Sequence, residues 1–395
     1  MIPSRVNPGK FYALPQAPQQ YKQLLMVGGV DKYFQIAPCF RDEDPRADRH
    51  SCEFYQVDAE MSFVHQDDVF AVAESYATEM VTALVPHKTI TVDFARISYD
   101  EAMQTYGSDK PDLRFGMEFC DLSELARNSG FSVFSAAVAE SGIVKAIKLD
   151  QQTMTRKELD EITEVAKQAG AGGLAYLIFE EKQEDVEYVH PGVRSPIAKF
   201  LSAEEIADIQ DQTNAEQGDI LFFAAGAPAL VHKVLNKVRL YCRDKYELAD
   251  PNELAFCWIT DFPFYEYDEA RQAWDFGHNP FSHVVGGVEA LKTKDCSEIQ
   301  TNQYDLVLNG YEILSGSIRN HNPEVMVAAF EKLGLSEADV KERFGAMYEA
   351  FQYGAPPHGG FAFGFDRLMM ILIDEPSIRE CYAFPKSGKA EDVMM

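Results

Sequence analysis

Two neighbouring stretches near the start of the chain carry charged side chains at the spacing of a β-strand. Between residues 55 and 63 apolar and polar residues alternate, so that Asp58 and Glu60 fall on one side. Such alternation is typical of half-buried strands. Residues 33–41 alternate too and end at Arg41. We expect a hairpin that directs Arg41, Asp58 and Glu60 into one concavity, where they could hold a ligand with both a phosphate and an amine. The simpler alternative is an ordinary hairpin with a solvated charged turn.

A glycine-rich stretch near the end of the chain could hold an anion. Residues 359–364 read Gly-Gly-Phe-Ala-Phe-Gly, which predicts a strand that a ligand or another backbone can approach closely. Phe365, Asp366 and Arg367 then open a helix whose next six residues are apolar. Because a helix N-terminus favours anions, Arg367 in its first turn could bind a phosphate. The alternative is a core helix whose arginine forms a salt bridge.

A third group of charged residues occupies positions 305–319. Asp305 and Glu312 offer hard oxygen ligands suited to magnesium. Glu312 and Arg319 are seven residues apart, which places them on opposite faces of a regular strand. A bulge at residues 315–317 would bring both side chains to one face, and we expect it there.

Composition limits the compartment and the partners. The seven scattered cysteines form no Cys-x-x-Cys pair, which favours a reduced, cytoplasmic protein without zinc. A net charge of −27 argues against DNA as a partner, because broad nucleic-acid affinity depends on neutralising phosphates. No apolar run reaches the length of a membrane span, so we expect no membrane partner.

The middle of the chain has the pattern of a separate α/β domain. Thr155 with Glu158, and Ser202 with Glu205, form capping-box signatures at predicted helix starts. Apolar strands are expected at residues 144–149, 173–179 and 220–224, between these helices. The chain therefore reads as three segments, with an insertion at 114–248 that divides a larger domain into residues 1–113 and 249–395. His190 and His232 in the insertion are expected at the surface.

The sequence resembles the class II aminoacyl-tRNA synthetases, in particular the aspartyl branch of bacterial type. Phe-Arg-Asp-Glu-Asp at residues 40–44 and the strand after it resemble motif 2. Residues 16–23 are similar to the segment that binds the amino acid, and residues 354–367 are similar to motif 3. The resemblance implies an α+β fold, an antiparallel sheet flanked by helices, in which residues 114–248 match the GAD insertion. The family has an anticodon-binding domain and motif 1 upstream, so the chain reads as a fragment.

The activity implied by this resemblance is that of an aspartate–tRNA ligase. Such an enzyme forms aspartyl-adenylate from L-aspartate and Mg-ATP, then transfers the aspartyl group to the 3′ end of tRNA(Asp). Transfer to tRNA(Asn) as well stays open, and the full-length enzyme is expected to be a homodimer. The asparaginyl and lysyl branches share motifs 2 and 3 and are competing assignments. A non-catalytic synthetase-like protein that binds an amino acid or tRNA is the alternative from another class.

The resemblance also assigns roles to individual residues. The catalytic residues would be Arg41 and Arg367. ATP would be bound by Arg41, Asp42, Glu43, His50, Phe54, Glu312, Gly364, Phe365, Asp366 and Arg367. Aspartate would be bound by Gln19, Lys22, Arg41, Asp58, His278 and Arg319. Magnesium would be held by Asp305 and Glu312. Where the family has paired histidines on a mobile loop, this chain has His278 and Asn279.

Overall fold

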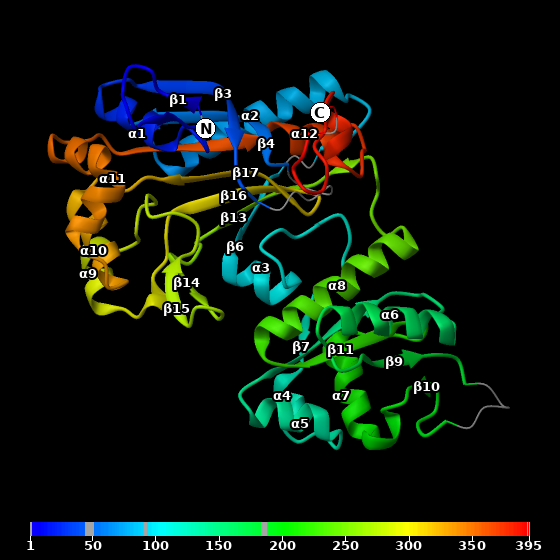
Figure 1. Cartoon of the computed structure of the whole chain (residues 1–395). Coiled ribbons are helices and arrows are strands. Elements are labelled where there is room, and N and C mark those ends of the chain that lie inside the picture. The colour runs from blue at the N-terminus through cyan, green and yellow to red at the C-terminus, as the bar shows by residue number, and fades with distance from the viewer. Residues whose placement is uncertain (1, 44–50, 91–92, 183–187, 393, 395) are drawn as a thin grey trace. The chain divides into compact units, whose positions relative to one another are not determined.

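The chain forms two compact units in a computed structural model, which describes residues 2–43, 51–90, 93–182, 188–392 and 394. The first unit comprises Met1–Tyr99 and Phe256–Met395, and the second comprises Asp100–Ala255. Each unit is built around its own sheet, and both chain ends belong to the first unit (Figure 1).

The first unit contains a seven-stranded sheet. Its order is β3 (Lys32–Phe40), β4 (Glu53–Ser62), β18 (His358–Gly364), β17 (Tyr311–Ile318), β16 (Gln303–Leu308), β13 (Phe256–Thr260) and β6 (Ala95–Ser98). Neighbouring strands run antiparallel except β13 and β6, which are parallel. With helices on both faces, this is the α+β architecture that was expected.

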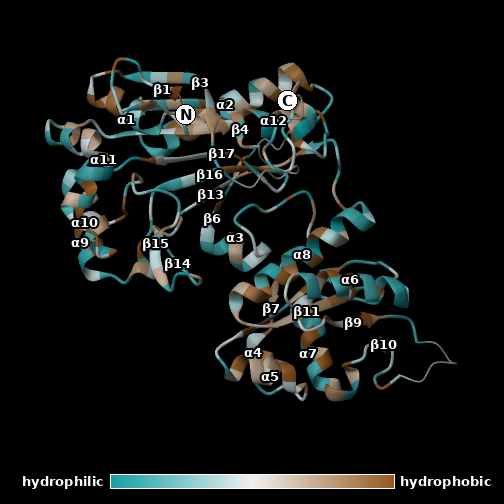
Figure 2. Ribbon diagram, viewed as in Figure 1, coloured by the Kyte–Doolittle hydropathy of each residue, from teal (hydrophilic) through white to brown (hydrophobic). Residues whose placement is uncertain are grey.

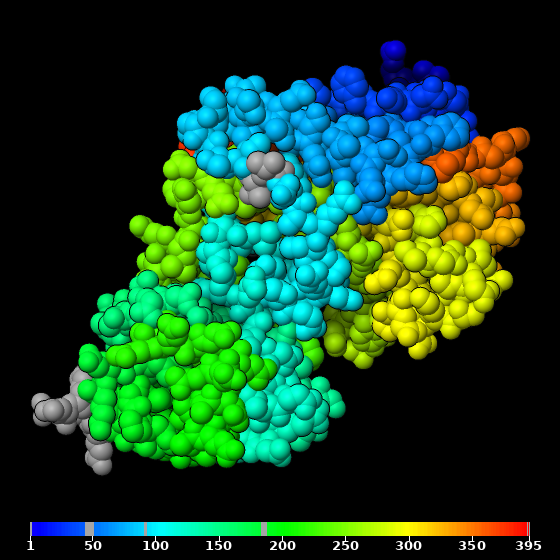
Figure 3. Space-filling view, turned by 180° about the vertical axis from the view of Figure 1, so that it is seen from behind, coloured from blue at the N-terminus to red at the C-terminus, as the bar shows by residue number. Residues whose placement is uncertain are grey.

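Helices cover the two faces of this sheet. On one face lies α2 (Gln66–Leu84), where the ring of Phe70 stacks on Trp258 with centroids 3.8 Å apart. Figure 3 shows α2 in light blue at the surface of this side. On the other face, α1 (Gln19–Val27) and α12 (Phe365–Leu372) contact β4. The remaining elements of the unit include β1 (Ile2–Pro3), β2 (Phe11–Tyr12), β5 (Thr89–Ile90), β14 (Tyr265–Asp268), β15 (Ala273–Phe276), α9 (Gly287–Thr293), α10 (Pro323–Lys332) and α11 (Glu337–Gln352).

Strand register gathers polar side chains on the face that carries α1 and α12. Asp58 on β4 lies opposite Ala362 on β18, which lies opposite Ser315 on β17. In the next row, Glu60 lies opposite Gly360, which lies opposite Ser317 on β17. Because β18 contributes only small residues here, its neighbours have room for long polar side chains. The alternation predicted for residues 55–62 is confirmed by this register.

The bulge between Glu312 and Arg319 exists, but the predicted position at residues 315–317 was wrong. Leu306 on β16 pairs with Leu314, whereas the next residue, Val307, pairs with Glu312. Ile313 is therefore the extra residue. The sheet keeps regular pairing at residues 315–317 because β18 continues the ladder there. The consequence is the expected one, since Glu312 and Arg319 face the same side.

The second unit contains a five-stranded sheet in which all pairs are antiparallel. Its order is β10 (Val193–Arg194), β9 (Ala175–Phe179), β11 (Ile220–Gly226), β8 (Ile143–Leu149) and β7 (Cys120–Asp121). Strands and helices alternate along the chain, yet β8 and β9 do not pair because β11 lies between them. Figure 2 shows the apolar character of β9, whose residues enter the cores on both faces of the sheet.

Two helices of this unit begin where the sequence predicted. Both capping boxes are confirmed, with Thr155 at the start of α6 (Arg156–Gln168) and Ser202 at the start of α7 (Ala203–Thr213). The other helices are α3 (Tyr99–Tyr106), α4 (Ser123–Ala126), α5 (Ser132–Ala139) and α8 (Pro228–Tyr246). His232 was expected at the surface, and this was wrong. It points from α8 into the core, 5% exposed, with its ring beside Phe119.

The second unit is wider than the expected insertion, 114–248, which lies inside it. Arg239 and Arg243 on α8 explain the difference, because both bind Asp112, which precedes the predicted boundary. Arg239 donates to the backbone oxygen of Asp112 at 2.9 Å, and Arg243 pairs with its carboxylate at 3.0 Å. Lys145 on β8 likewise donates to the backbone oxygen of Gln104 at 2.7 Å. Assignment of this unit as a GAD domain stays a prediction.

Candidate functional site

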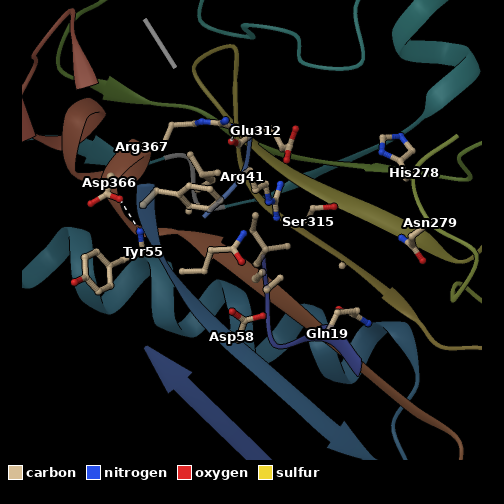
Figure 4. Close-up of a pocket in the computed structure, with 18 of the residues that line it drawn as sticks. Gln19, Arg41, Tyr55, Asp58, His278, Asn279, Glu312, Ser315, Asp366 and Arg367 are labelled. Carbon is tan, nitrogen blue, oxygen red and sulfur yellow. Dashed lines mark hydrogen bonds between the residues drawn. The ribbon is translucent and has the colours of Figure 1, made fainter. Parts of the chain in front are cut away.

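A cavity of about 390 Å³ lies on the polar face of the seven-stranded sheet. It is lined by side chains from α1, the β3–β4 hairpin, β17, β18, α12 and the loop after β15. In Figure 4, Arg41, Arg367 and Glu312 gather at one end of this cavity, and Asp58 and Gln19 lie at the other. His278 and Asn279 border it on a third side.

The first end presents two cations and an aromatic ring. The guanidinium carbon of Arg41 lies 5.1 Å from the ring centroid of Phe54, which is the geometry of a cation–π contact. Arg367, in the first turn of α12, donates from Nη1 to the backbone oxygen of Glu312. A flat ring with two guanidinium groups nearby can hold an aromatic base and the phosphates attached to it.

Asp366 links the two chain segments that form this end. Its carboxylate accepts the backbone N–H of Tyr55 at 2.8 Å, which ties α12 to β4 (Figure 4). Burial raises the pKa of Asp366 above its ordinary value, and the hydrogen bond from Tyr55 partly opposes this. Asp366 therefore fixes the relation between Arg367 and the β3–β4 hairpin.

The opposite end contains a buried network of four charges. Lys22 on α1 lies 3.0 Å from Asp58 and 3.4 Å from Glu60. Arg319 donates to both oxygens of Glu60, from Nε at 2.9 Å and from Nη2 at 3.2 Å. None of the four side chains is more than 4% exposed. Burial alone would raise the pKa of Glu60, but Arg319 and Lys22 outweigh it and hold that pKa below its ordinary value.

Two polar atoms at this end lack an internal partner. Asp58 uses Oδ1 to bind Lys22, and its Oδ2 has no hydrogen-bond partner in the described part of the chain. The side-chain amide nitrogen of Gln19 is likewise buried without a partner among the described residues. Since buried polar groups are nearly always paired in proteins, this end is suited to a polar ligand with an ammonium group for Asp58.

The loop after β15 is organised by Asn279. Its Oδ1 accepts from the backbone N–H of Phe281 at 2.9 Å and from Oγ of Ser282 at 3.3 Å. His278 packs its ring edge-on against Phe262, with centroids 5.2 Å apart. Asn279 thus has a turn-forming role, in the position where the resemblance expects a second histidine.

Most of the predicted site residues meet in this one cavity. Those that line it are Gln19, Lys22, Arg41, Glu43, Phe54, Asp58, His278, Glu312, Arg319, Gly364, Asp366 and Arg367. Asp42 and Phe365 are exposed outside it, and His50 lies outside the described residues. Their predicted roles, like those of the lining residues, stay predictions.

The predicted metal pair is only half in the cavity. Glu312 lines it, whereas Asp305 is 1% exposed on β16, opposite Ser315, and does not. Within the described ranges, no three His, Cys, Asp or Glu side chains are arranged to hold a metal ion. A magnesium ion would therefore need oxygen ligands from a bound substrate as well.

Several lining residues had been given no role, among them Gln56 and Ser315. The period-two alternation that placed Asp58 on this face places Gln56 there as well. Ser315 shares a strand face with Arg319. Glu60 had been placed on the correct face, but no local pattern indicated that it binds Arg319. That contact joins two residues 259 positions apart.

The family model "tRNA synthetases class II (D, K and N)" matches residues 1–388. The aspartate–tRNA(Asp/Asn) ligase of Chlorobium phaeovibrioides (strain DSM 265 / 1930) is 50% identical over 100% of this chain and 64% of its own length. The ligase of the same name from Rhizobium meliloti (strain 1021) is 48% identical over 100% of this chain and 66% of its own length. The chain thus spans slightly less than two thirds of these relatives.

A solved aspartyl tRNA synthetase from Entamoeba histolytica is a more distant match. It is 17% identical, with a TM-score of 0.46, over 98% of this chain and 54% of that chain. This likeness is too remote to carry a conclusion about the site.

Proposed function

We propose that this chain, which belongs to the class II tRNA synthetases (D, K and N), contains the site that activates L-aspartate with ATP. The observation that carries the proposal is the charge arrangement in one cavity. Lys22, Arg319 and Asp58 lie at one end, and Arg41, Arg367 and Phe54 at the other. An amino acid and a nucleotide could therefore bind in the same cavity with their reacting groups adjacent.

The buried end suits aspartate among the three amino acids of this family. A lysine and an arginine together favour a side-chain carboxylate over a neutral amide or a second ammonium group. Asp58 would accept the α-ammonium group through Oδ2, the atom that Lys22 does not use. Both curated relatives described above are named as aspartate ligases, which supports the same assignment.

The open end would hold ATP. Phe54 would stack on adenine, and Arg367 would cover the opposite face of the base and reach the phosphates. Arg41 would neutralise the α-phosphate while the aspartate α-carboxylate attacks it and pyrophosphate leaves. This reaction depends on in-line positioning and charge neutralisation more than on proton transfer.

Magnesium fits the chemistry of Glu312 and Asp305. Both are carboxylates, and both project from the same face of the sheet, which the bulge at Ile313 makes possible. When bound, the ion would neutralise charge on the phosphates and orient them. Glu312, which lines the cavity, would bind the ion directly. Asp305, which is buried on the same face of the sheet, would support it without lining the cavity.

The proposal extends to the longer protein of which the relatives are examples. Such a protein would transfer the aspartyl group to tRNA(Asp), and to tRNA(Asn) as well if it shares the specificity stated in the relatives' names. We further propose a cytoplasmic homodimer. Among the residues that the structure describes, no helix has the length and apolar character needed to cross a membrane.

Pyrophosphate exchange into ATP tests the proposal. The 395-residue chain should catalyse exchange that depends on L-aspartate and magnesium. Asparagine and lysine should support much less exchange, and Arg41→Ala should lower it by more than a hundredfold, as about 3–4 kcal/mol of lost stabilisation implies. A non-catalytic binding protein would bind aspartate or ATP without any exchange, and that result would overturn the proposal.

A further inference from the structure

The carboxylate of Glu60 lies directly behind the cavity. Glu60 is 0% exposed and does not line the cavity, whereas both of its cationic partners, Lys22 and Arg319, do. It projects from β4 toward Gly360, where an added side-chain carbon would lie 2.3 Å from its Oε2. Glu60 can therefore occupy this position because residue 360 has no side chain.

The hydrogen bonds of Arg319 show what this position does. A guanidinium group has five N–H donors. Nε and one N–H of Nη2 bind Glu60, and one N–H of Nη1 binds Oγ of Ser317 at 2.8 Å. Among the described residues this leaves two donors without a partner, one on each terminal nitrogen. Two N–H groups on the terminal nitrogens of a guanidinium group can make a two-pronged match for a carboxylate.

We propose that Glu60 is a positioning residue for the amino-acid substrate. By occupying the Nε–Nη2 edge of Arg319, it turns the terminal edge toward the cavity and leaves that edge for the side-chain carboxylate of the ligand. The inference rests on the proposed function and deepens it, since it names what sets side-chain selectivity at that site. Ser317 holds the same guanidinium group from the other side.

Two other roles for Glu60 would have different consequences for binding. If Glu60 only opposed the charge of Lys22 and Arg319, its neutralisation would leave the cavity more cationic, and an anionic side chain would bind more tightly. If it only stabilised the fold, all ligands would lose affinity together. The positioning role predicts a selective loss.

The test measures binding, so it does not depend on turnover. The probes are a non-hydrolysable aspartyl-adenylate analogue, its asparaginyl counterpart and ATP alone, titrated into the 395-residue chain. Glu60→Gln keeps the size of the side chain but removes its charge. We expect the affinity for the aspartyl analogue to fall at least tenfold. Affinity for the asparaginyl analogue should change less than threefold, and that for ATP less than twofold.

Two comparisons separate positioning from a structural role. In an Arg319→Leu background, Glu60→Gln should cause less than a threefold further loss, because the residue through which it acts is absent. Ser62→Ala is the matched control, since Ser62 is on the same face of β4 but its hydroxyl group contacts Met26 and Val30 among the described residues, not Arg319. It should leave all three affinities unchanged.

Several outcomes would overturn the inference. Tighter binding of the aspartyl analogue by Glu60→Gln would assign Glu60 the opposing-charge role, and a uniform loss would assign it a structural role. If Glu60→Gln fails to fold, Ser317→Ala tests the same idea, with an expected threefold to tenfold loss for the aspartyl analogue alone. Failure of the unaltered chain to prefer the aspartyl analogue would instead count against the proposed function.

Discussion

Replacing Gly360 by alanine should damage the buried end of the site by a mechanism that can be worked out in advance. Gly360 lies between Glu60 on β4 and Ser317 on β17. A Cβ atom at this position would lie 2.1 Å from the backbone oxygen of Ala59 and 2.3 Å from Oε2 of Glu60. Both distances are far below van der Waals contact, so strand β4 and the Glu60 side chain must both move.

The expected cost combines two effects. Overpacking a well-filled interior typically costs about 1–3 kcal/mol. Displacing Glu60 also weakens its bond to Arg319, and losing one partner of a buried ion pair costs about 3–5 kcal/mol. Since the pair would be distorted and not removed, only part of this second cost applies, and we expect Gly360→Ala to lower the free energy of unfolding by about 3 kcal/mol.

Urea denaturation followed by circular dichroism measures this change, and Gly359→Ala is the matched control. A Cβ atom at Gly359 would meet Cδ1 of Ile318 at 2.6 Å, which is the end of a side chain that can rotate away, and the oxygen of Ser317 at 3.3 Å. The free energy of unfolding of that variant should fall by less than about 1 kcal/mol, as for most tolerated substitutions. Equal losses for the two variants, or a loss below about 1 kcal/mol for Gly360→Ala, would refute the steric reasoning.

Three further predictions concern the chemistry and the pH dependence of the site. Arg41→Ala and Arg367→Ala should each lower the exchange rate by a factor that corresponds to about 3–4 kcal/mol, as for loss of a preorganised charge donor; exchange within threefold of the unaltered chain would contradict the assignment. Arg319→Leu should raise the KM for aspartate and lower turnover, while the Kd for ATP, measured by calorimetry without amino acid, stays within twofold; a collapse of ATP binding would place Arg319 at the phosphates. Burial holds the pKa of His358 below its ordinary value of 6.5. The unfolded chain therefore takes up a proton there more readily, and the stability associated with this residue is complete above pH 6.5 and declines as the pH falls. His358→Gln should reduce the loss of unfolding free energy between about pH 7 and pH 5, and an unchanged pH profile would show that His358 is not responsible.

The sequence was sufficient to predict the features that depend on local periodicity. Alternation over residues 55–62 correctly assigned Asp58 and Glu60 to one strand face, and the capping boxes located the starts of α6 and α7. These patterns are readable because each reflects the geometry of a single element.

Features that depend on pairing between distant segments could not be read in this way. The bulge lies at Ile313 because of how β16 and β17 pair, and the three serine and glycine residues at 315–317 were a misleading signal. His232 is a polar residue on a helix, and the neighbouring sequence does not indicate that it is buried. The core of the second unit nevertheless encloses it. The Glu60–Arg319 bond likewise requires β4, β18 and β17 to be adjacent, which no short stretch of sequence specifies.

The central claim is that the cavity activates aspartate, and the most direct measurement is to identify the adenylate it makes. The chain would be incubated with Mg-ATP, pyrophosphatase and equimolar aspartate, asparagine and lysine, and the products would be identified by mass spectrometry. The arrangement of Lys22, Asp58 and Arg319 predicts aspartyl-adenylate as the main product. Absence of any adenylate, or asparaginyl- or lysyl-adenylate in equal or greater amount, would contradict it.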